Sequence, residues 1–256
     1  MKSRRSLVVL AAVLAFAGCG GSAPTYPKQA SEVGPIGSGA DGAWLFQPAG
    51  KPKSLVIFFH GQGGADEATP INHLPWINHL VQRGNIVVYP RYEMAYLVNP
   101  LVHAVAGVRA ATDRVDADDL PVFAIGYSRG GGLVVEYAAA SKADKTPVPG
   151  TVMAVFPTGT GDQGRITNLA PLNHSTRLDI LVGDKDTIVG NRGARLMLRR
   201  LEVGGFPGQN IRLHFIHSTK SFTADHLAPM QTSPGAQRAF WGLADRLLAA
   251  QRAAAS

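Results

Sequence analysis

Short apolar runs recur along the chain and predict the strands of a sheet. The run Ser54–His60 is almost continuously apolar, which is typical of a central strand covered on both faces. It stops at a glycine-rich turn, as a strand does where the chain changes direction. Six more runs predict the other strands: Ala43–Gln47, Asn85–Tyr89, Val122–Ile125, Thr151–Phe156, Leu178–Val182 and Ile211–Ile216.

Segments between these runs carry apolar residues at helical spacing. In the segment 101–115, Leu101, Val105 and Val108 share one face. Helices are also predicted at 69–83, where Pro75 lies near the start, and at 133–140, 191–202 and 234–250. The alternation predicts one α/β domain over residues 39–256, with a mostly parallel sheet of seven or eight strands and helices on both faces.

The chain turns sharply between the predicted strand that ends at Ile125 and the next helix. The turn reads Gly126-Tyr127-Ser128-Arg129-Gly130, with a glycine two residues before and two residues after the serine. A strand-to-helix reversal this tight leaves no room for a Cβ at the glycines, and it exposes the serine hydroxyl at the carboxyl edge of the sheet. This arrangement resembles the nucleophile elbow of the α/β-hydrolase superfamily. The alternative is a serine that only caps the following helix.

A second glycine-rich turn, His60-Gly61-Gln62-Gly63-Gly64, follows the predicted central strand. The superfamily that the chain resembles places one half of its oxyanion hole at such a turn, because backbone N–H groups approach a substrate oxygen only where side chains do not crowd it. The resemblance implies one donor at the amide of Gln62, with Gly63 as the competing choice, and a second at the amide of Arg129. Otherwise the turn is a plain loop in which His60 caps the strand.

An acidic residue is expected after the strand Leu178–Val182. The chain continues as Gly183-Asp184-Lys185-Asp186, and the resemblance assigns the acid that meets the histidine to Asp186, with Asp184 capping the loop. A carboxylate in this role fixes the tautomer of the imidazole and stabilises imidazolium. The alternative is a turn or N-cap role for Asp186.

The resemblance places the catalytic base in the loop after the last strand, where His226 lies ten residues beyond Ile216. His217 at the strand end is the rival, and His214 alternates with apolar neighbours and is interpreted as structural. The chain order Ser128, Asp186, His226, with each residue after a strand, favours His226.

Several residues are candidates to line a substrate pocket. Arg91, Tyr92 and Tyr96 follow the strand Asn85–Tyr89 on the side of the sheet where such folds bind ligands, although solvated loop positions are the favoured interpretation. Tyr127, beside the serine, is a further candidate. The segment 157–177 is rich in Gly, Thr, Asn and Pro and lacks helical periodicity, so no large cap domain is expected and the site should be open.

The N-terminus has the pattern of an export signal. Basic residues at positions 2, 4 and 5 precede the apolar run Leu7–Ala17, which is too short to span a bilayer, and Gly18 and Cys19 follow. The end of this run resembles the lipobox of bacterial lipoproteins, in which the cysteine is acylated, so residues 1–18 are predicted to be a signal peptide, 19–38 a flexible tether and Cys19 the lipid anchor. A general secretory signal that is cut later is the alternative.

Composition excludes several other classes of function. The chain has 256 residues, 45% hydrophobic and 17% charged, with a net charge of +7; without the basic residues 2, 4 and 5, 22 basic side chains face 18 acidic ones, a balance of +4. No basic helix face indicates a nucleic-acid partner. One cysteine permits no internal disulfide, and no metal or phosphate-binding motif occurs, so neither a metal nor another cofactor is expected.

The resemblance covers nearly all of the predicted domain and implies a serine hydrolase of carboxylic esters, most similar to the capless dienelactone-hydrolase and small-esterase members. It implies an acyl-enzyme on Ser128 and a small-molecule or polymeric ester as substrate. We expect a monomer that meets the membrane through its lipid anchor only, outside the bacterial cytoplasm. A peptidase or thioesterase with the same triad, and a surface-anchored binding protein without catalysis, are the alternatives.

Overall fold

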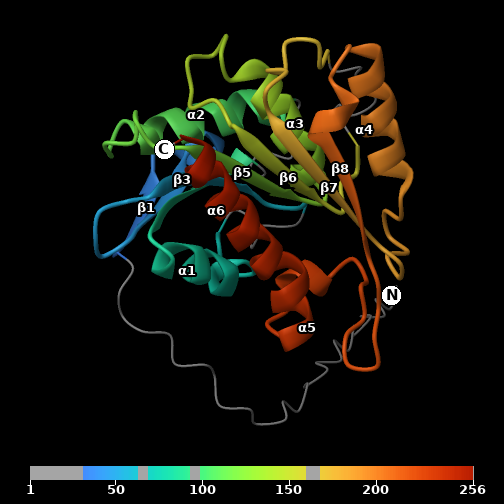
Figure 1. Ribbon diagram of the computed structural model, residues 1–256. Coiled ribbons are helices and arrows are strands. Elements are labelled where there is room, and N and C mark those ends of the chain that lie inside the picture. Colours follow the sequence, from blue (N-terminus) through green and yellow to red (C-terminus); the bar gives the residue numbers. More distant parts are fainter. Residues whose placement is uncertain (1–30, 63–68, 93–98, 160–167, 256) are drawn as a thin grey trace, which may run out of the picture.

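One eight-stranded sheet runs through the centre of the protein, as the computed structural model shows (Figure 1). The structure describes residues 31–62, 69–92, 99–159 and 168–255. The strands follow the order β1-β2-β4-β3-β5-β6-β7-β8 across the sheet. Their bounds are β1 Ser31–Ile36, β2 Ala43–Gln47, β3 Ser54–Phe59, β4 Asn85–Pro90, β5 Val122–Tyr127, β6 Thr151–Val155, β7 Arg177–Gly183 and β8 Ile211–Ile216.

Most of the sheet is parallel. Strands β3 to β8 run in the same direction, and β2 is antiparallel to both β1 and β4. Every residue of β3, β4 and β6 is buried, as the continuous apolar runs predict for strands covered on both faces. The predicted mostly parallel sheet is therefore confirmed, with eight strands.

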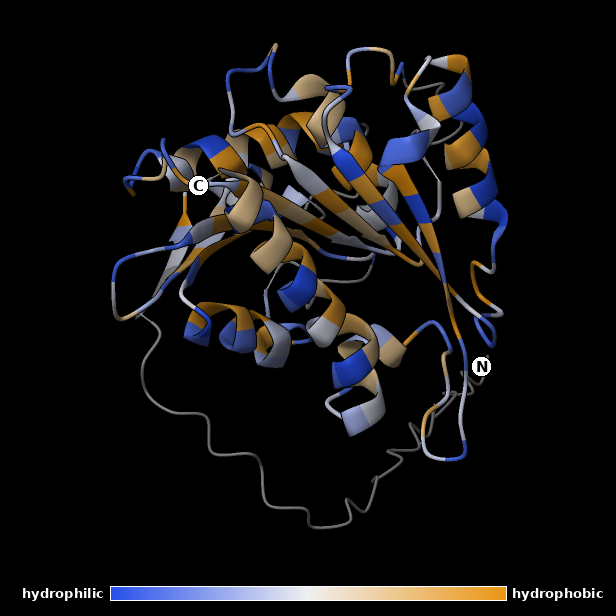
Figure 2. Ribbon diagram, viewed as in Figure 1, coloured by the Kyte–Doolittle hydropathy of each residue, from blue (hydrophilic) through white to orange (hydrophobic). Residues whose placement is uncertain are grey.

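Helices cover both faces of the sheet, each over its own apolar cluster. Helices α2, α3 and α4 lie on one face, and α1, α5 and α6 lie on the other (Figure 1). In Figure 2 the strands between these layers are largely hydrophobic, as expected for a sheet that helices shield from water on both faces. The helices are α1 Leu74–Gln82, α2 Pro100–Thr112, α3 Arg129–Ala140, α4 Arg192–Val203, α5 Pro234–Ala236 and α6 Gly242–Ala255; a π-helical turn, Gln237–Trp241, joins the last two.

Strand β1 lies inside the segment 19–38, which the sequence predicts to be a tether. Residues Ser31–Ile36 instead pair with β2 at the edge of the sheet, and the register shifts between Val33 and Ile36. Pro35 lies within that irregularity, and an edge strand tolerates a residue without an N–H. The Gly-Pro composition that suggested a tether is thus compatible with an edge strand.

Several predictions concern residues outside the described ranges. They are the signal peptide, the lipid anchor at Cys19, the end of the glycine-rich turn at Gly63 and Gly64, and the candidate pocket residue Tyr96. Within the described ranges, no helix combines the length and the apolar character that crossing a bilayer requires. Between β6 and β7, residues 156–159 and 168–176 contain no helix, in keeping with the expectation that the segment carries no helical cap.

Candidate active site

Ser128 occupies the turn between β5 and α3 in a backbone conformation that is rare for a residue with a side chain. Its φ is 55° and its ψ is −117°, and the helix begins at the next residue, Arg129. Because β5 is a parallel strand in the middle of the sheet, this turn lies at the carboxyl edge. The expected strand, turn and helix are therefore present.

The two flanking glycines are required by close backbone contacts. A Cβ at Gly126 would lie 2.0 Å from the carbonyl oxygen of Gly130, and a Cβ at Gly130 would lie 2.3 Å from the carbonyl oxygen of His60. Both distances are far below van der Waals contact and both neighbours are backbone atoms. The predicted lack of room for a Cβ is confirmed at both positions.

The structure brings Ser128, His226 and Asp186 together from three separate loops. The Nε2 atom of His226 lies 2.9 Å from the Oγ atom of Ser128, and its Nδ1 atom lies 2.8 Å from the Oδ2 atom of Asp186. All three residues are buried. An imidazole held this way has one ring nitrogen turned to a carboxylate and the other to a hydroxyl, which is the geometry of an activated nucleophile.

Backbone amides hold Asp186 in this position. The N–H groups of Ile188 and Val189 both donate to its Oδ1 atom at 3.0 Å, while Oδ2 faces the imidazole. The carboxylate thus has hydrogen-bond partners on both oxygens, as a buried charge requires. The loop after β7 therefore presents one oxygen of Asp186 in a fixed direction.

The rival residues make other contacts. Asp184 accepts hydrogen bonds from the hydroxyl and the amide of Ser218, which lower the pKa of its carboxyl, and His217 is exposed and lies 3.7 Å from the same carboxylate. These residues join the loops after β7 and β8. His214 instead bonds to the buried carboxylate of Asp179 at 2.7 Å, in agreement with its structural interpretation.

The glycine-rich turn after β3 lies against the serine. A Cβ at Gly61 would lie 3.0 Å from the ring of Tyr127 and 3.3 Å from the Cβ of Ser128, so little separates this turn from the nucleophile candidate. Gln62, the next residue, is exposed, and Arg129 begins α3, where the helix dipole is positive. Of the two predicted oxyanion donors, Gln62 follows a residue that packs against Ser128, and Arg129 follows Ser128 itself in the chain. Gly63 lies outside the described residues.

Two of the predicted substrate-lining residues have other roles. Tyr127 and Tyr92 are only 4% and 1% exposed, and their hydroxyl groups donate to the carbonyl oxygens of His226 at 2.8 Å and His60 at 2.5 Å. Because both side chains are turned into the protein, we correct the prediction that they line a pocket. Arg91 is half-buried, and burial lowers the pKa of its guanidinium; its predicted role stays a prediction.

Two exposed apolar side chains beside the site were not predicted. Ile188 is 70% exposed and follows Asp186 by two residues, and Leu227 is 52% exposed and follows His226 directly. Their proximity follows from the chain, since consecutive Cα atoms are about 3.8 Å apart. The signal available in the sequence was an apolar residue two positions after the candidate acid and another directly after the candidate base.

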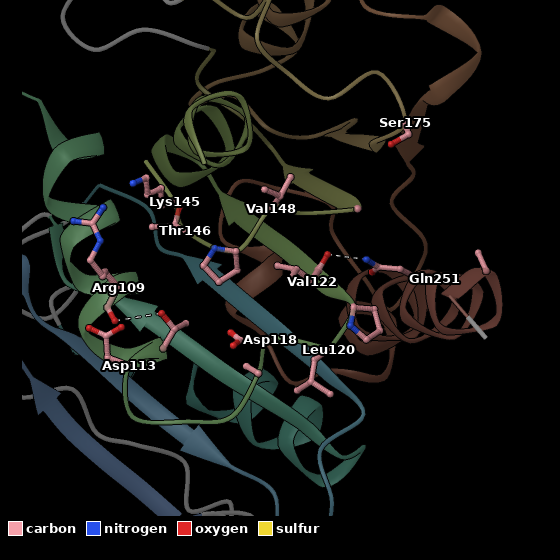
Figure 3. Close-up of a pocket in the computed structure, with 16 residues that line it drawn as sticks. Arg109, Asp113, Asp118, Leu120, Val122, Lys145, Thr146, Val148, Ser175 and Gln251 are labelled. Carbon is pink, nitrogen blue, oxygen red and sulfur yellow. Dashed lines mark hydrogen bonds between the residues drawn. The ribbon is translucent and has the colours of Figure 1, made fainter. Parts of the chain in front are cut away.

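A hollow in the described surface lies away from these residues. It has a volume of about 860 Å³ and is bordered by the end of α2, the amino ends of β5 and β6, and the end of α6 (Figure 3). Arg109, Asp113, Lys145 and Gln251 are among its lining residues, and none of the predicted site residues is. It therefore opens at the edge of the sheet opposite Ser128. Among the residues that the structure describes, no group of three or more His, Cys, Asp or Glu could hold a metal ion.

Comparisons with known proteins give the fold. No protein-family model and no curated protein matches this sequence. Among solved structures, MGS-M1, an α/β hydrolase enzyme from a Medee basin deep-sea metagenome library, is 15% identical, with a TM-score of 0.62 over 87% of this chain and 97% of its own. Esterase B from Lactobacillus rhamnosis, with a tributyrin phosphonate inhibitor, is 14% identical, with a TM-score of 0.66 over 88% and 87%.

A third solved structure, carboxyl esterase 2 from the mycorrhizal fungus Tuber melanosporum, is 17% identical, with a TM-score of 0.58 over 86% and 85% of the two chains. At these identities the likeness concerns the fold. The chain has the α/β-hydrolase fold, with an open, mostly parallel sheet covered by helices on both faces.

Proposed function

We propose that this protein is a serine hydrolase that cleaves carboxylic esters, with Ser128 as nucleophile, His226 as general base and Asp186 as the acid that orients it. The observation that carries the proposal is the continuous pair of hydrogen bonds from the Asp186 carboxylate through the imidazole to the Ser128 hydroxyl, 2.8 Å and 2.9 Å long. The α/β-hydrolase fold, shared with two esterases, supports it.

In the proposed reaction, His226 accepts the Ser128 proton as the hydroxyl oxygen attacks the ester carbonyl carbon. The amides of Gln62 and Arg129 donate to the oxyanion of the tetrahedral intermediate. The intermediate collapses, the alcohol leaves with the proton from His226, and an acyl-enzyme forms. Water that transfers its proton to His226 then attacks the acyl group, and the acid leaves while Ser128 regains its proton.

The apolar side chains beside the site favour a substrate with an apolar acyl or alcohol group. Ile188 and Leu227 expose hydrocarbon surface at the same edge as Ser128, and burying apolar surface contributes roughly 25 cal/mol per Å². Esterase B, which shares the fold, was solved with a tributyrin phosphonate inhibitor. Butyrate esters are therefore suitable first substrates.

The test combines covalent labelling with hydrolysis of chromogenic esters from acetate to palmitate. We expect a fluorophosphonate to label the wild-type protein, and the Ser128→Ala variant to lose both the label and at least about 10⁴-fold in kcat. Ser175→Ala is the matched control, because Ser175 has an exposed hydroxyl at the opposite edge of the sheet. It should keep the label and the wild-type kcat.

Three outcomes would count against the proposal. Labelling that persists in Ser128→Ala would show that another residue reacts. A wild-type protein that neither reacts nor hydrolyses any ester would favour a binding protein that keeps the fold without catalysis. Hydrolysis of peptides or thioesters in preference to oxygen esters would assign the same residues to a different substrate.

A further inference from the structure

The hydroxyl group of Tyr127 reaches the main chain of the candidate base. It donates to the carbonyl oxygen of His226 at 2.8 Å, and the two rings lie 5.3 Å apart at an interplanar angle of 36°. A buried phenol usually finds a hydrogen-bond partner. Here the partner is the backbone of the residue whose side chain contacts Ser128.

Tyr127 has a second connection to the site through the chain itself. It is the last residue of β5, and Ser128 follows it directly. One residue therefore joins the nucleophile candidate covalently and the base candidate by a hydrogen bond. The ring between these two ends is packed against Gly61 and is 4% exposed, so its position is set by the core.

The loop that carries His226 needs such a support. Between β8 and the short 3₁₀ turn Ala228–Met230 the chain has neither helix nor regular strand. Several hydrogen bonds join this loop to the loop after β7: Ser218 to Asp184, the Lys185 amide to the Ala224 carbonyl, and the imidazole to Asp186. The Tyr127 hydroxyl adds a bond to β5, the strand that bears Ser128.

We propose that Tyr127 is a positioning residue, whose hydroxyl holds the His226 main chain so that the imidazole points at Ser128 and Asp186 at once. The proposal rests on the hydrolase function proposed above. Without the hydroxyl, the loop keeps its bonds to the β7 side and the contact of the imidazole with Ser128, but its main chain loses the hydrogen bond to Tyr127. The distance from Nε2 to the Ser128 hydroxyl then varies, and a misplacement of 1 Å can cost about 10²-fold in rate.

The test is Tyr127→Phe in the full-length protein, which keeps the ring and removes the hydroxyl. Tyr137→Phe is the matched control, because Tyr137 is also buried and its hydroxyl also donates to a backbone carbonyl, that of Pro147 at 2.9 Å. With p-nitrophenyl butyrate, we expect Tyr127→Phe to lower kcat about 10- to 100-fold with KM within about twofold of wild type. Tyr137→Phe should leave kcat and KM unchanged. Each of the two variants loses one buried hydrogen bond, so both should lower the melting temperature by a similar amount.

A measurement without substrate separates this proposal from the proposed function. The NMR resonance of the imidazole proton on Nδ1 of His226 should be visible in the wild type and in Tyr137→Phe, and exchange-broadened in Tyr127→Phe. If kcat and this resonance are the same in Tyr127→Phe and Tyr137→Phe, the positioning role is overturned. If the wild type hydrolyses no ester but the resonance broadens only in Tyr127→Phe, the hydrolase proposal fails and the positioning role stands.

Discussion

Ser128 is held in its unusual backbone conformation by hydrogen bonds on both sides. Its amide donates to the carbonyl of Val155 at 2.9 Å, and its carbonyl accepts from the amides of Gly131 at 2.9 Å and Thr158 at 3.1 Å. A residue in a sparsely populated region costs roughly 1–3 kcal/mol and persists only where its surroundings impose it. These three bonds attach the turn to β6 and to the first turn of α3.

A methyl group at Gly130 should disrupt this turn. Gly130→Ala places a Cβ against the carbonyl oxygens of His60 and Phe59, at 2.3 Å and 2.5 Å, and neither backbone can move without displacing the oxyanion-hole candidate. We expect the free energy of unfolding to fall by about 3 kcal/mol or more and esterase activity to be lost. Urea denaturation and the kcat measurement check this.

Gly50→Ala is the control for that variant, because a Cβ at Gly50 would meet no atom within 4 Å and its φ is not in the left-handed region. It should be neutral or slightly stabilising. If Gly130→Ala and Gly50→Ala have the same free energy of unfolding and the same kcat, the close contacts at Gly130 relax without cost.

At the scale of elements, a hydrogen-bonded network around one buried carboxylate joins β7 to β8. The Asp179 carboxylate, whose side chain is 0% exposed, accepts hydrogen bonds from Arg177 at 2.7 Å and 3.1 Å and from His214 at 2.7 Å. Burial by itself would raise the pKa of Asp179, but the hydrogen bonds from His214 and Arg177, with their charges, outweigh it and lower the pKa. The charge of Asp179 therefore stabilises the pairing of the last two strands.

Removal of this charge should destabilise the protein in a pH-dependent way. The pKa of Asp179 in the folded state lies below its ordinary value. The contribution of its charge to the free energy of unfolding is therefore complete above the unfolded pKa of about 3.9, and it is lost as the pH falls through the folded pKa. We expect Asp179→Asn to lower the free energy of unfolding by about 2 kcal/mol at pH 7 and by progressively less below pH 4. Urea denaturation between pH 7 and pH 2 measures the difference.

Asp118→Asn is the matched control for the network, since Asp118 is an exposed aspartate outside it. It should change stability by less than about 0.5 kcal/mol at any pH. If the free energies of unfolding of the wild type and Asp179→Asn differ by the same amount down to pH 2, the assigned role of the Asp179 charge is contradicted.

For the whole molecule, the parallel sheet separates two edges with different properties. Ser128, Asp186 and His226 follow β5, β7 and β8, so they share the carboxyl edge, which is where open α/β sheets bind ligands. The large hollow of Figure 3 lies at the amino edge. The hollow and the three residues therefore lie at opposite ends of the sheet.

We also propose that the whole protein is exported and anchored by a lipid on Cys19. In a bacterial host, we expect Cys19→Ala to move the domain from the membrane fraction to the soluble fraction, because the acyl chains provide the attachment. The measurement is the esterase activity and antibody signal in the two fractions after ultracentrifugation. Ser22→Ala, in the same predicted tether, should stay with the membrane.

An unchanged membrane fraction in Cys19→Ala would refute the anchor, and wild-type protein in the soluble fraction would favour a general secretory signal. Neither result bears on the hydrolase proposal, since that proposal is argued from Ser128, Asp186 and His226 and not from Cys19.

The sequence by itself determined seven of the eight strands, β2 to β8, most of the helical segments, the fold class and the residues Ser128, Asp186 and His226 as candidates. It could do so because buried parallel strands are continuous apolar runs and because the Ser128 turn admits only glycine at fixed positions. Only the tertiary structure decided that Ser31–Ile36 joins the sheet edge and that Tyr127 and Tyr92 turn inward. Edge pairing and side-chain direction depend on neighbours that are distant in the chain, and a local pattern carries no information about them.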